Sequence, residues 1–135
     1  MRRPLILGLL LSLGCAGTMY SRFAGPVTSP PDEVYGCVQA QLKTMGYQRT
    51  QYNEGTRWYV AQKNEQVQSS SGLYRKTVHV LDTQVKSDGA GQSSLEIVAH
   101  TFDEFANAKG VDRQERKAAD RVLLDATALG QACSK

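Results

Sequence analysis

The sequence predicts an α+β fold with two layers: a helix, a four-stranded antiparallel sheet and a second helix, with both helices on one sheet face. Two observations carry this prediction. Apolar residues recur at three- and four-residue steps in two end segments, about 29–46 and 112–132. Between them lie four segments rich in β-branched and aromatic residues, divided by turn signals. A chain of 135 residues that is 41% hydrophobic has room for one such domain.

The chain begins with a pattern typical of a secretory signal. Arg2 and Arg3 give a positive start, and an apolar run follows from Pro4 to Leu13. This run is roughly half of the ~20 residues that a membrane-spanning helix needs, so it predicts targeting and not a membrane span. Removal of the signal lowers the formal net charge from +3 to nearly neutral, because two of the 16 basic residues leave with it.

The segment Leu11-Ser12-Leu13-Gly14-Cys15 resembles the lipobox of bacterial lipoproteins, although that family most often has Leu where this chain has Ser12. The resemblance implies cleavage before Cys15 and acylation of its sulfur and amine, with more than one acyl chain holding the protein at a membrane. An ordinary secretory cleavage near Ala16 is the alternative, and it would discard Cys15.

Ala16 follows the cysteine, where Asp retains lipoproteins at the inner membrane of well-studied Gram-negative bacteria. By this analogy, the resemblance implies an outer-membrane lipoprotein that faces the periplasm. The chain then divides into a signal peptide at 1–14, the acylated cysteine with a tether at 15–28, and an α+β domain at 29–135.

Local signals mark the predicted helices. The first helix starts at Ser29-Pro30-Pro31-Asp32, where a hydroxyl N-cap, prolines and a first-turn acid all favour a helix start, and it ends at Gly46. In the second helix, Asp112 and Glu115 form an acidic variant of the capping box, and the helix continues to about Ala132.

Each helix places one cysteine on its apolar stripe, Cys37 in the first and Cys133 in the second. With Cys15 assigned to lipid, these two predict a disulfide in an oxidising compartment. Closing a loop of roughly 100 residues stabilises a domain by about 4 to 5 kcal/mol in the chain-entropy model. The bridge requires antiparallel helices, and in an up-and-down chain this agrees with an even number of strands between them.

The four predicted strands cover about 47–52, 56–63, 74–86 and 93–102. We expect the two long strands to form a hairpin whose apolar residues share the face beneath the helices. These residues are Val78, Val80, Leu95, Ile97 and Ala99. The opposite face then carries a half-apolar surface that is the candidate binding face. Its residues are His79, Leu81, Val98, His100 and Phe102.

Adjacent aromatic residues on the second strand must point to opposite faces. We place Trp58 in the core and Tyr59 outside. An exposed Tyr59 would be able to join Tyr47 and Tyr52 in an aromatic platform for carbohydrate or peptide.

Enzyme signatures are absent from the sequence, and we expect no catalytic residues and no cofactor. On the predicted register, His79 and His100 share a sheet face, where Glu96 would complete a metal site, but two surface histidines are the commoner outcome and we expect no metal. The small net charge and the lack of a long basic run argue against nucleic acid as a partner.

These features predict a membrane-anchored envelope lipoprotein without catalytic activity. In the first hypothesis it is an interaction or assembly subunit that binds an envelope protein through the uncovered sheet face or the second helix. The alternative is a periplasmic binding module for a glycan, a peptide or a lipid fragment.

Overall fold

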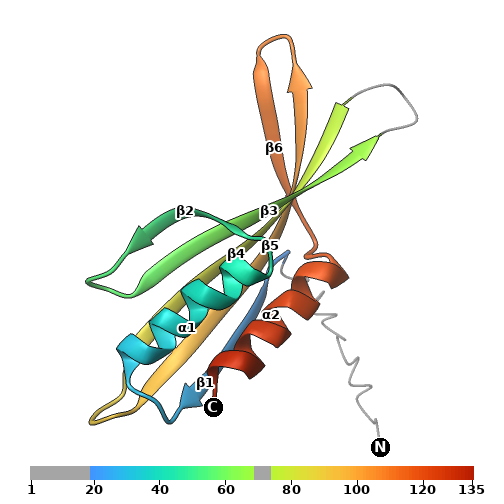
Figure 1. Cartoon of the computed structure of the whole chain (residues 1–135). Helices are drawn as coiled ribbons and strands as arrows, with labels where there is room; N and C mark the ends of the chain where they lie inside the picture. The colour runs from blue at the N-terminus through green and yellow to red at the C-terminus, as the bar shows by residue number, and fades with distance from the viewer. Residues whose placement is uncertain (1–18, 69–73) are drawn as a thin grey trace, which may run out of the picture.

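The computed structural model describes residues 19–68 and 74–135, so the predicted signal peptide and Cys15 lie outside the described residues. Within these ranges, no helix has the length and apolar character needed to cross a membrane. All strand pairs are antiparallel, in a sheet of order β1-β5-β4-β3-β2, with β6 also paired to β5. The elements are β1 (Ser21–Val27), α1 (Pro31–Thr44), β2 (Gln48–Asn53), β3 (Trp58–Gln68), β4 (Tyr74–Ser87), β5 (Ser93–Asn107), β6 (Gly110–Arg116) and α2 (Asp120–Cys133) (Figure 1).

The sheet has six strands, so the prediction of four strands is wrong. β5 is 15 residues long, and two short strands share one of its edges. β1 pairs with 93–99 of β5, and β6 pairs with 101–107. The missed β1 lies in the segment predicted to be a tether, and its small residues and Pro26 are compatible with an edge strand. Ser21–Val27 therefore belong to the sheet.

β6 occupies the segment predicted to start the second helix. Asp112 and Glu115 belong to this strand and form no capping box, because α2 starts only at Asp120. The chain reverses between β5 and β6 at Gly110, whose φ of 135° strongly favours glycine. In the same turn, the side chain of Asn107 donates a hydrogen bond to Asp112 and accepts one from the Lys109 N–H. These turn contacts favour a hairpin over a longer helix.

Helix α1 matches the prediction closely and ends before Gly46, which has a φ of 83°. The predicted hydroxyl cap is wrong, since Pro30 is the N-cap residue and the Ser29 hydroxyl donates to the backbone carbonyl of Lys135. The predicted disulfide between Cys37 and Cys133 is present in the structure, with a Cα–Cα distance of 5.7 Å.

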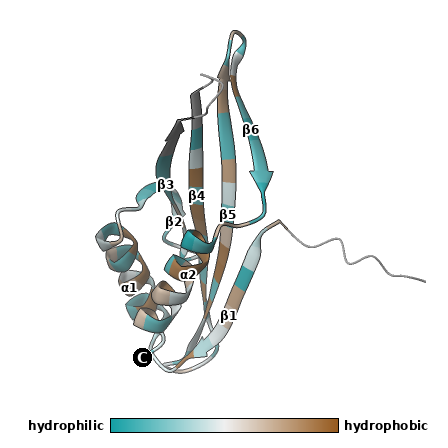
Figure 2. Ribbon diagram, turned by 90° about the vertical axis from the view of Figure 1, so that its right-hand side faces the viewer, coloured by the Kyte–Doolittle hydropathy of each residue, from teal (hydrophilic) through white to brown (hydrophobic). Residues whose placement is uncertain are grey.

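The helices run antiparallel, although five strands and not four separate them in the chain (Figure 1). The even-number argument fails because β6 and α2 follow one another in the same direction, without the reversal that an up-and-down chain assumes. Both helices lie on one side of the sheet, and the opposite side carries no helix (Figure 2). We call these the covered face and the open face.

The main core lies between the helices and the covered face. The largest fully buried side chains in it come from both helices and from the central strands β4 and β5. They are Val34, Val38, Leu42, Leu81, Val85, Ile97, Val122 and Leu129. Burial of each such side chain contributes about 1.5 to 3 kcal/mol relative to exposure, so this layer is the main source of the fold's stability.

The register between β4 and β5 differs from the predicted one by an odd number of residues. Leu81 lies opposite Ala99, and Val85 lies opposite Leu95, so the odd-numbered residues of β4 face the helices. Val78 and Val80 therefore lie on the open face, where they form a small second apolar cluster with Val60. A shift by one residue turns every side chain of a strand to the other face, and this explains the whole error.

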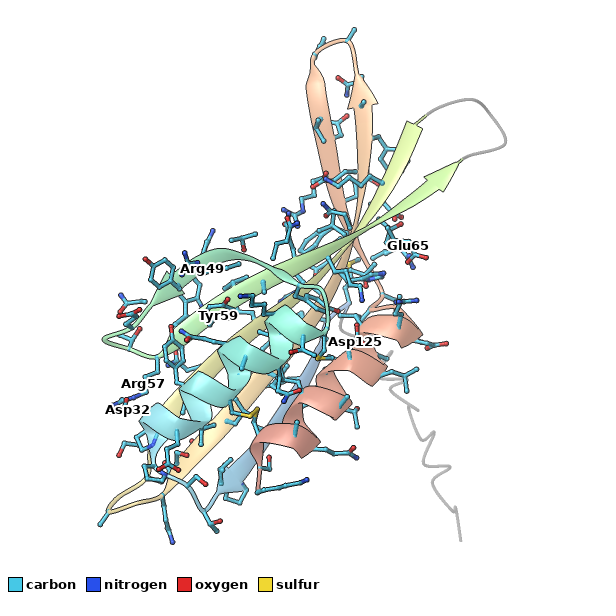
Figure 3. The ribbon with its side chains drawn as sticks, in the orientation of Figure 1. Asp32, Arg49, Arg57, Tyr59, Glu65 and Asp125 are labelled. Atoms are coloured by element: carbon cyan, nitrogen blue, oxygen red, sulfur yellow. A yellow bond between two sulfur atoms is a disulfide. The ribbon has the colours of Figure 1, made fainter. Side chains whose placement is uncertain are left out.

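The same shift of faces applies to β3. Trp58 packs against the open-face cluster, whereas Tyr59 is 8% exposed and belongs to the main core beneath α1 (Figure 3). The predicted placement of these two rings was therefore reversed.

Candidate functional site

Two neighbouring hollows lie on the open face, with volumes of about 400 and 350 Å³. Each volume falls within the range of small-molecule sites, roughly 300–1,000 Å³. Three residues line both hollows: Trp58 from β3, Asp82 from β4 and His100 from β5. The hollows therefore adjoin, and we call these three residues the junction.

The first hollow extends from the junction towards β1. Its lining is mostly polar and carries both signs of charge. Arg22 and Glu96 form a long ion pair in it, with 3.8 Å between Nη1 and Oε2. Beyond the junction, the lining residues are Tyr20, Arg22, Gln84, Lys86, Glu96 and Val98.

The second hollow extends towards β2 and β6 and is more apolar. Val60 and Val80 form its base, and both belong to the small apolar cluster against which Trp58 and Phe102 pack. Polar side chains surround this base. They are Thr50, Gln51, Gln62 and Arg113, together with the polar members of the junction.

A hydrogen bond fixes two of the junction residues. The indole Nε1–H of Trp58 donates to Oδ1 of Asp82 over 2.7 Å. A carboxylate accepts several hydrogen bonds, so Asp82 Oδ2 remains available to a ligand on the open face. The indole ring is thereby held beside a free acceptor, and no helix covers either group.

His100 is fixed by contacts on three sides. Its Nδ1 lies 2.6 Å from Oε1 of Glu115, so Nδ1 carries a proton that it donates to this carboxylate. Its ring lies between those of Tyr20 and Phe102, at centroid distances of 5.5 and 5.8 Å. Arg113 covers Phe102, with Cζ 4.1 Å from the ring centroid. Nε2 has no hydrogen-bond partner among the described residues, which leaves it free for a ligand.

The five residues predicted to form one binding face lie on two faces. Val98, His100 and Phe102 are on the open face, but Leu81 is fully buried beneath the helices and His79 is only 2% exposed. The two histidines therefore do not form the predicted cross-strand pair. In residues 19–68 and 74–135, no group of three or more His, Cys, Asp or Glu side chains is arranged to hold a metal ion.

His79 instead joins a polar chain that runs from the exposed Glu65 to the buried Thr101. Its Nε2 lies 3.1 Å from Glu65 Oε2, and its Nδ1 lies 3.3 Å from Thr101 Oγ1. The hydrogen bond with His79 holds the pKa of Glu65 below its ordinary value. An acid, an imidazole and a hydroxyl in this order can activate a nucleophile. Thr101, however, is fully buried, and its Oγ1 accepts the Ala119 N–H beside the start of α2, so this chain has a structural role.

The three tyrosines proposed for an aromatic platform do not come together on an exposed surface. Tyr59 is buried (Figure 3), and Tyr47 is buried with its hydroxyl donating to Oδ2 of Asp125 over 2.8 Å. Burial, and then this hydrogen bond, raise the pKa of Tyr47 far above its ordinary value. Only Tyr52 of the three is exposed, and the Arg49 guanidinium lies 4.1 Å from its ring centroid.

Sequence reasoning missed Trp58, Asp82 and Arg113 as site residues. One signal would have placed Asp82 correctly. Asp82, Gln84 and Lys86 alternate along β4, and charged residues rarely point into a core without partners. Like Val78 and Val80, they are even-numbered residues of β4, and the structure places them all on the open face. Arg113 carries no such signal, because its segment resembles the start of a helix.

Comparison of the chain with protein-family models and with curated protein sequences finds no match. The functional argument therefore rests on the geometry of the chain itself.

Proposed function

We propose that the protein is a lipid-anchored, non-catalytic binding protein of the bacterial envelope, and that its open face is the binding surface. The observation that carries this proposal is the pair of adjoining hollows that meet at Trp58, Asp82 and His100. The covered face is filled by the core, whereas the open face offers free polar atoms beside aromatic rings. This contrast favours the binding module among the functions expected from the sequence.

The anchor is proposed from the lipobox-like segment, and Cys15 itself lies outside the described residues. Only residues 16–18 separate Cys15 from Met19, whose carbonyl accepts a hydrogen bond from the Ala118 N–H. Four extended steps of chain span about 14 Å at most. An acylated Cys15 would hold this end of the domain, which includes Tyr20 and the first hollow, close to the membrane surface.

Intact mass of the protein from the membrane fraction tests the anchor. We expect a chain that begins at Cys15 and carries the added mass of its acyl groups. Reduction should add two hydrogens, from the bond between Cys37 and Cys133. An unmodified chain that begins after Cys15 would refute the lipid anchor.

Photo-crosslinking in cells tests the binding surface. A photo-crosslinking phenylalanine analogue replaces Val98 in the first hollow or, as a matched control, Leu124, which is 70% exposed on α2. We expect covalent adducts with an envelope component from position 98 and few from position 124. Adducts from position 124 alone would assign binding to the second helix and refute the proposed surface.

One observation favours the second function, an interaction or assembly subunit. The hairpin of β5 and β6 extends beyond the helices (Figure 1), and Val111 near its tip is 65% exposed. Among the described strands, β6 pairs with β5 alone, so its outer edge can pair with a strand of another protein. The same crosslinker at Val111 would then give protein adducts, and their absence would count against this function.

A further inference from the structure

We propose that the open face binds a linear oligosaccharide, which lies across Trp58, Asp82 and His100 with sugar units in both hollows. This inference rests on the proposed function and names the ligand class of that surface. It follows from the shape of the surface, from the atoms that it offers and from the balance of its charges.

The shape favours an elongated ligand. The first hollow reaches Arg22 of β1, and the second reaches Thr50 and Gln51 of β2, at the other side of the sheet. Because the two hollows adjoin at the junction, they form one depression that runs across the sheet from β1 to β2. Neither hollow is enclosed by a helix, so a chain of several units can continue beyond either end.

The chemistry of the lining matches a sugar ring, which has apolar C–H faces and hydroxyl groups around its edge. Trp58 and Tyr20 offer aromatic surface that can pack against such faces. The same hollows are lined by polar atoms without partners in the described part of the chain. They are Asp82 Oδ2 and His100 Nε2, together with the side-chain amides of Gln51 and Gln62. Carboxylate and amide groups both accept from hydroxyls, and the amides also donate to them.

The charges disfavour a polyanion. Three cations line the depression, Arg22, Lys86 and Arg113. Arg22 pairs with Glu96, Arg113 lies 3.8 Å from a Glu104 oxygen, and Asp82 lies at the centre. A phosphate-rich ligand needs a surface of predominantly positive charge, which this one lacks.

An acyl chain fits the depression no better. A lipid tail needs an enclosed apolar cavity, because apolar surface must leave water to contribute binding energy. The first hollow is instead lined by five charged or amide side chains within one open depression, and desolvating them without new hydrogen bonds is costly. A neutral polyhydroxylated chain satisfies the same groups.

The single tryptophan of the chain makes the inference directly testable. Since Trp58 belongs to the junction, its fluorescence reports on occupancy of both hollows. The full-length protein in a detergent without sugar groups is titrated with tetrasaccharides of N-acetylglucosamine, β-1,4-glucose and α-1,4-glucose. We expect a saturable change in emission with at least one tetrasaccharide. It should bind about tenfold more tightly than its monosaccharide, because linked units occupy both hollows.

Two variants provide the matched comparison. His100→Ala removes a junction group, and we expect it to weaken tetrasaccharide binding about fivefold, as the loss of one hydrogen bond predicts. Thr127→Ala changes an exposed residue of α2, away from the open face, and should leave the affinity unchanged. Circular dichroism of each variant checks that it is folded.

Three results would overturn the inference. In the first, no tetrasaccharide changes the fluorescence of folded protein. In the second, a sulfated heparin oligosaccharide saturates the site and the neutral tetrasaccharides do not. In the third, the emission change follows protein concentration alone, which identifies a second copy of the chain as the occupant. If no sugar binds but the crosslinker at position 98 still gives adducts, the oligosaccharide is the wrong ligand and the proposed binding surface stands. If the titration and the crosslinking both give no signal, the proposed function is refuted too.

Discussion

The two faces of this sheet are built from the same strands but differ in how their polar groups are satisfied. On the covered face, His79, Thr83 and Thr101 are buried, and each has a hydrogen-bond partner within the protein. On the open face, Asp82 and His100 each use one polar atom within the protein and present another to solvent. The comparison teaches that both faces carry polar groups, and that the faces differ in how much hydrogen-bonding capacity those groups keep for a ligand.

Hydropathy also differs along the length of the strands. Brown, hydrophobic segments of β4 and β5 lie beside the helices, and the part of the sheet beyond them is more hydrophilic (Figure 2). At a finer scale, neighbouring residues of one strand belong to different faces. Leu81 is fully buried beneath the helices, whereas Asp82 is half-buried and belongs to the junction. We therefore expect substitutions on the covered face to lower stability and substitutions on the open face to weaken binding.

The largest effect is expected from the disulfide that joins the two helices over the covered face. Replacing both cysteines, Cys37→Ser with Cys133→Ser, should lower the free energy of unfolding by about 4 to 5 kcal/mol, because the unfolded chain regains its loop entropy. Urea unfolding measures this loss, and the wild type under reducing conditions is the control. A loss below ~1 kcal/mol would show that the bridge does little to hold the helices in place.

The next largest effect on stability is expected at a buried aliphatic residue of the covered face, and an aliphatic residue of the open face provides the comparison. Leu81→Ala removes a fully buried side chain and should cost about 2 to 5 kcal/mol of stability. Val98→Ala removes a half-buried side chain from the open face and should cost less than ~1 kcal/mol. Both are measured by urea unfolding. Equal losses would contradict the assignment of the two faces.

The two histidines provide a polar version of this comparison. His79→Leu leaves the Thr101 hydroxyl and the Glu65 carboxylate without their imidazole partner and should cost about 1 to 3 kcal/mol. His100→Leu alters a more exposed ring, and its cost should stay below ~1 kcal/mol. Thermal unfolding of both variants checks the order. A larger loss at His100 would reverse the assignment of the faces.

The smallest effect concerns the dependence of stability on pH. The pKa of Glu65 is lowered in the folded protein from an ordinary value of 4.5, so its ionised form stabilises the fold above about pH 4.5. This contribution is lost as the pH falls through the lower, folded-state pKa. Glu65→Gln should therefore be slightly less stable than the wild type at pH 7, and the difference should shrink at pH 3.

Thermal unfolding at both pH values measures this change, with the exposed Glu54→Gln as the control. If the difference between Glu65→Gln and wild type is the same at the two pH values, the hydrogen bond to His79 does not stabilise the ionised carboxyl.

The correct predictions depend on local sequence signals or, for the disulfide, on the two cysteines that remain once Cys15 is assigned to lipid. Helix α1 has prolines and an acid at its start and a glycine with positive φ after its end, and these act within a few residues. The bridge between Cys37 and Cys133 followed from their places on the inner stripes of two helices. Such features need no knowledge of which strands pair.

The wrong predictions depend on pairing between distant segments. β1 and β6 are short edge strands whose structure comes from β5, and the segment that became β6 carries a plausible helix cap in Asp112 and Glu115. The prediction of which β4 residues face the helices failed for a related reason. The hydrophobic Val78 and Val80 suggested that the even-numbered residues of β4 face the core, whereas Asp82 suggested that they face solvent. The predicted binding face contained the same error, so only its β5 residues, Val98, His100 and Phe102, lie on the open face.

The central claim is that the open face is the surface that is occupied in the envelope. Maleimide labelling of Val98→Cys, with Leu124→Cys as the exposed control, tests it in the purified protein and in intact envelopes. We predict that both thiols react in the purified protein, but that only position 124 stays reactive in the envelope. Equal reactivity of position 98 in the two preparations, with position 124 also unchanged, would contradict the account.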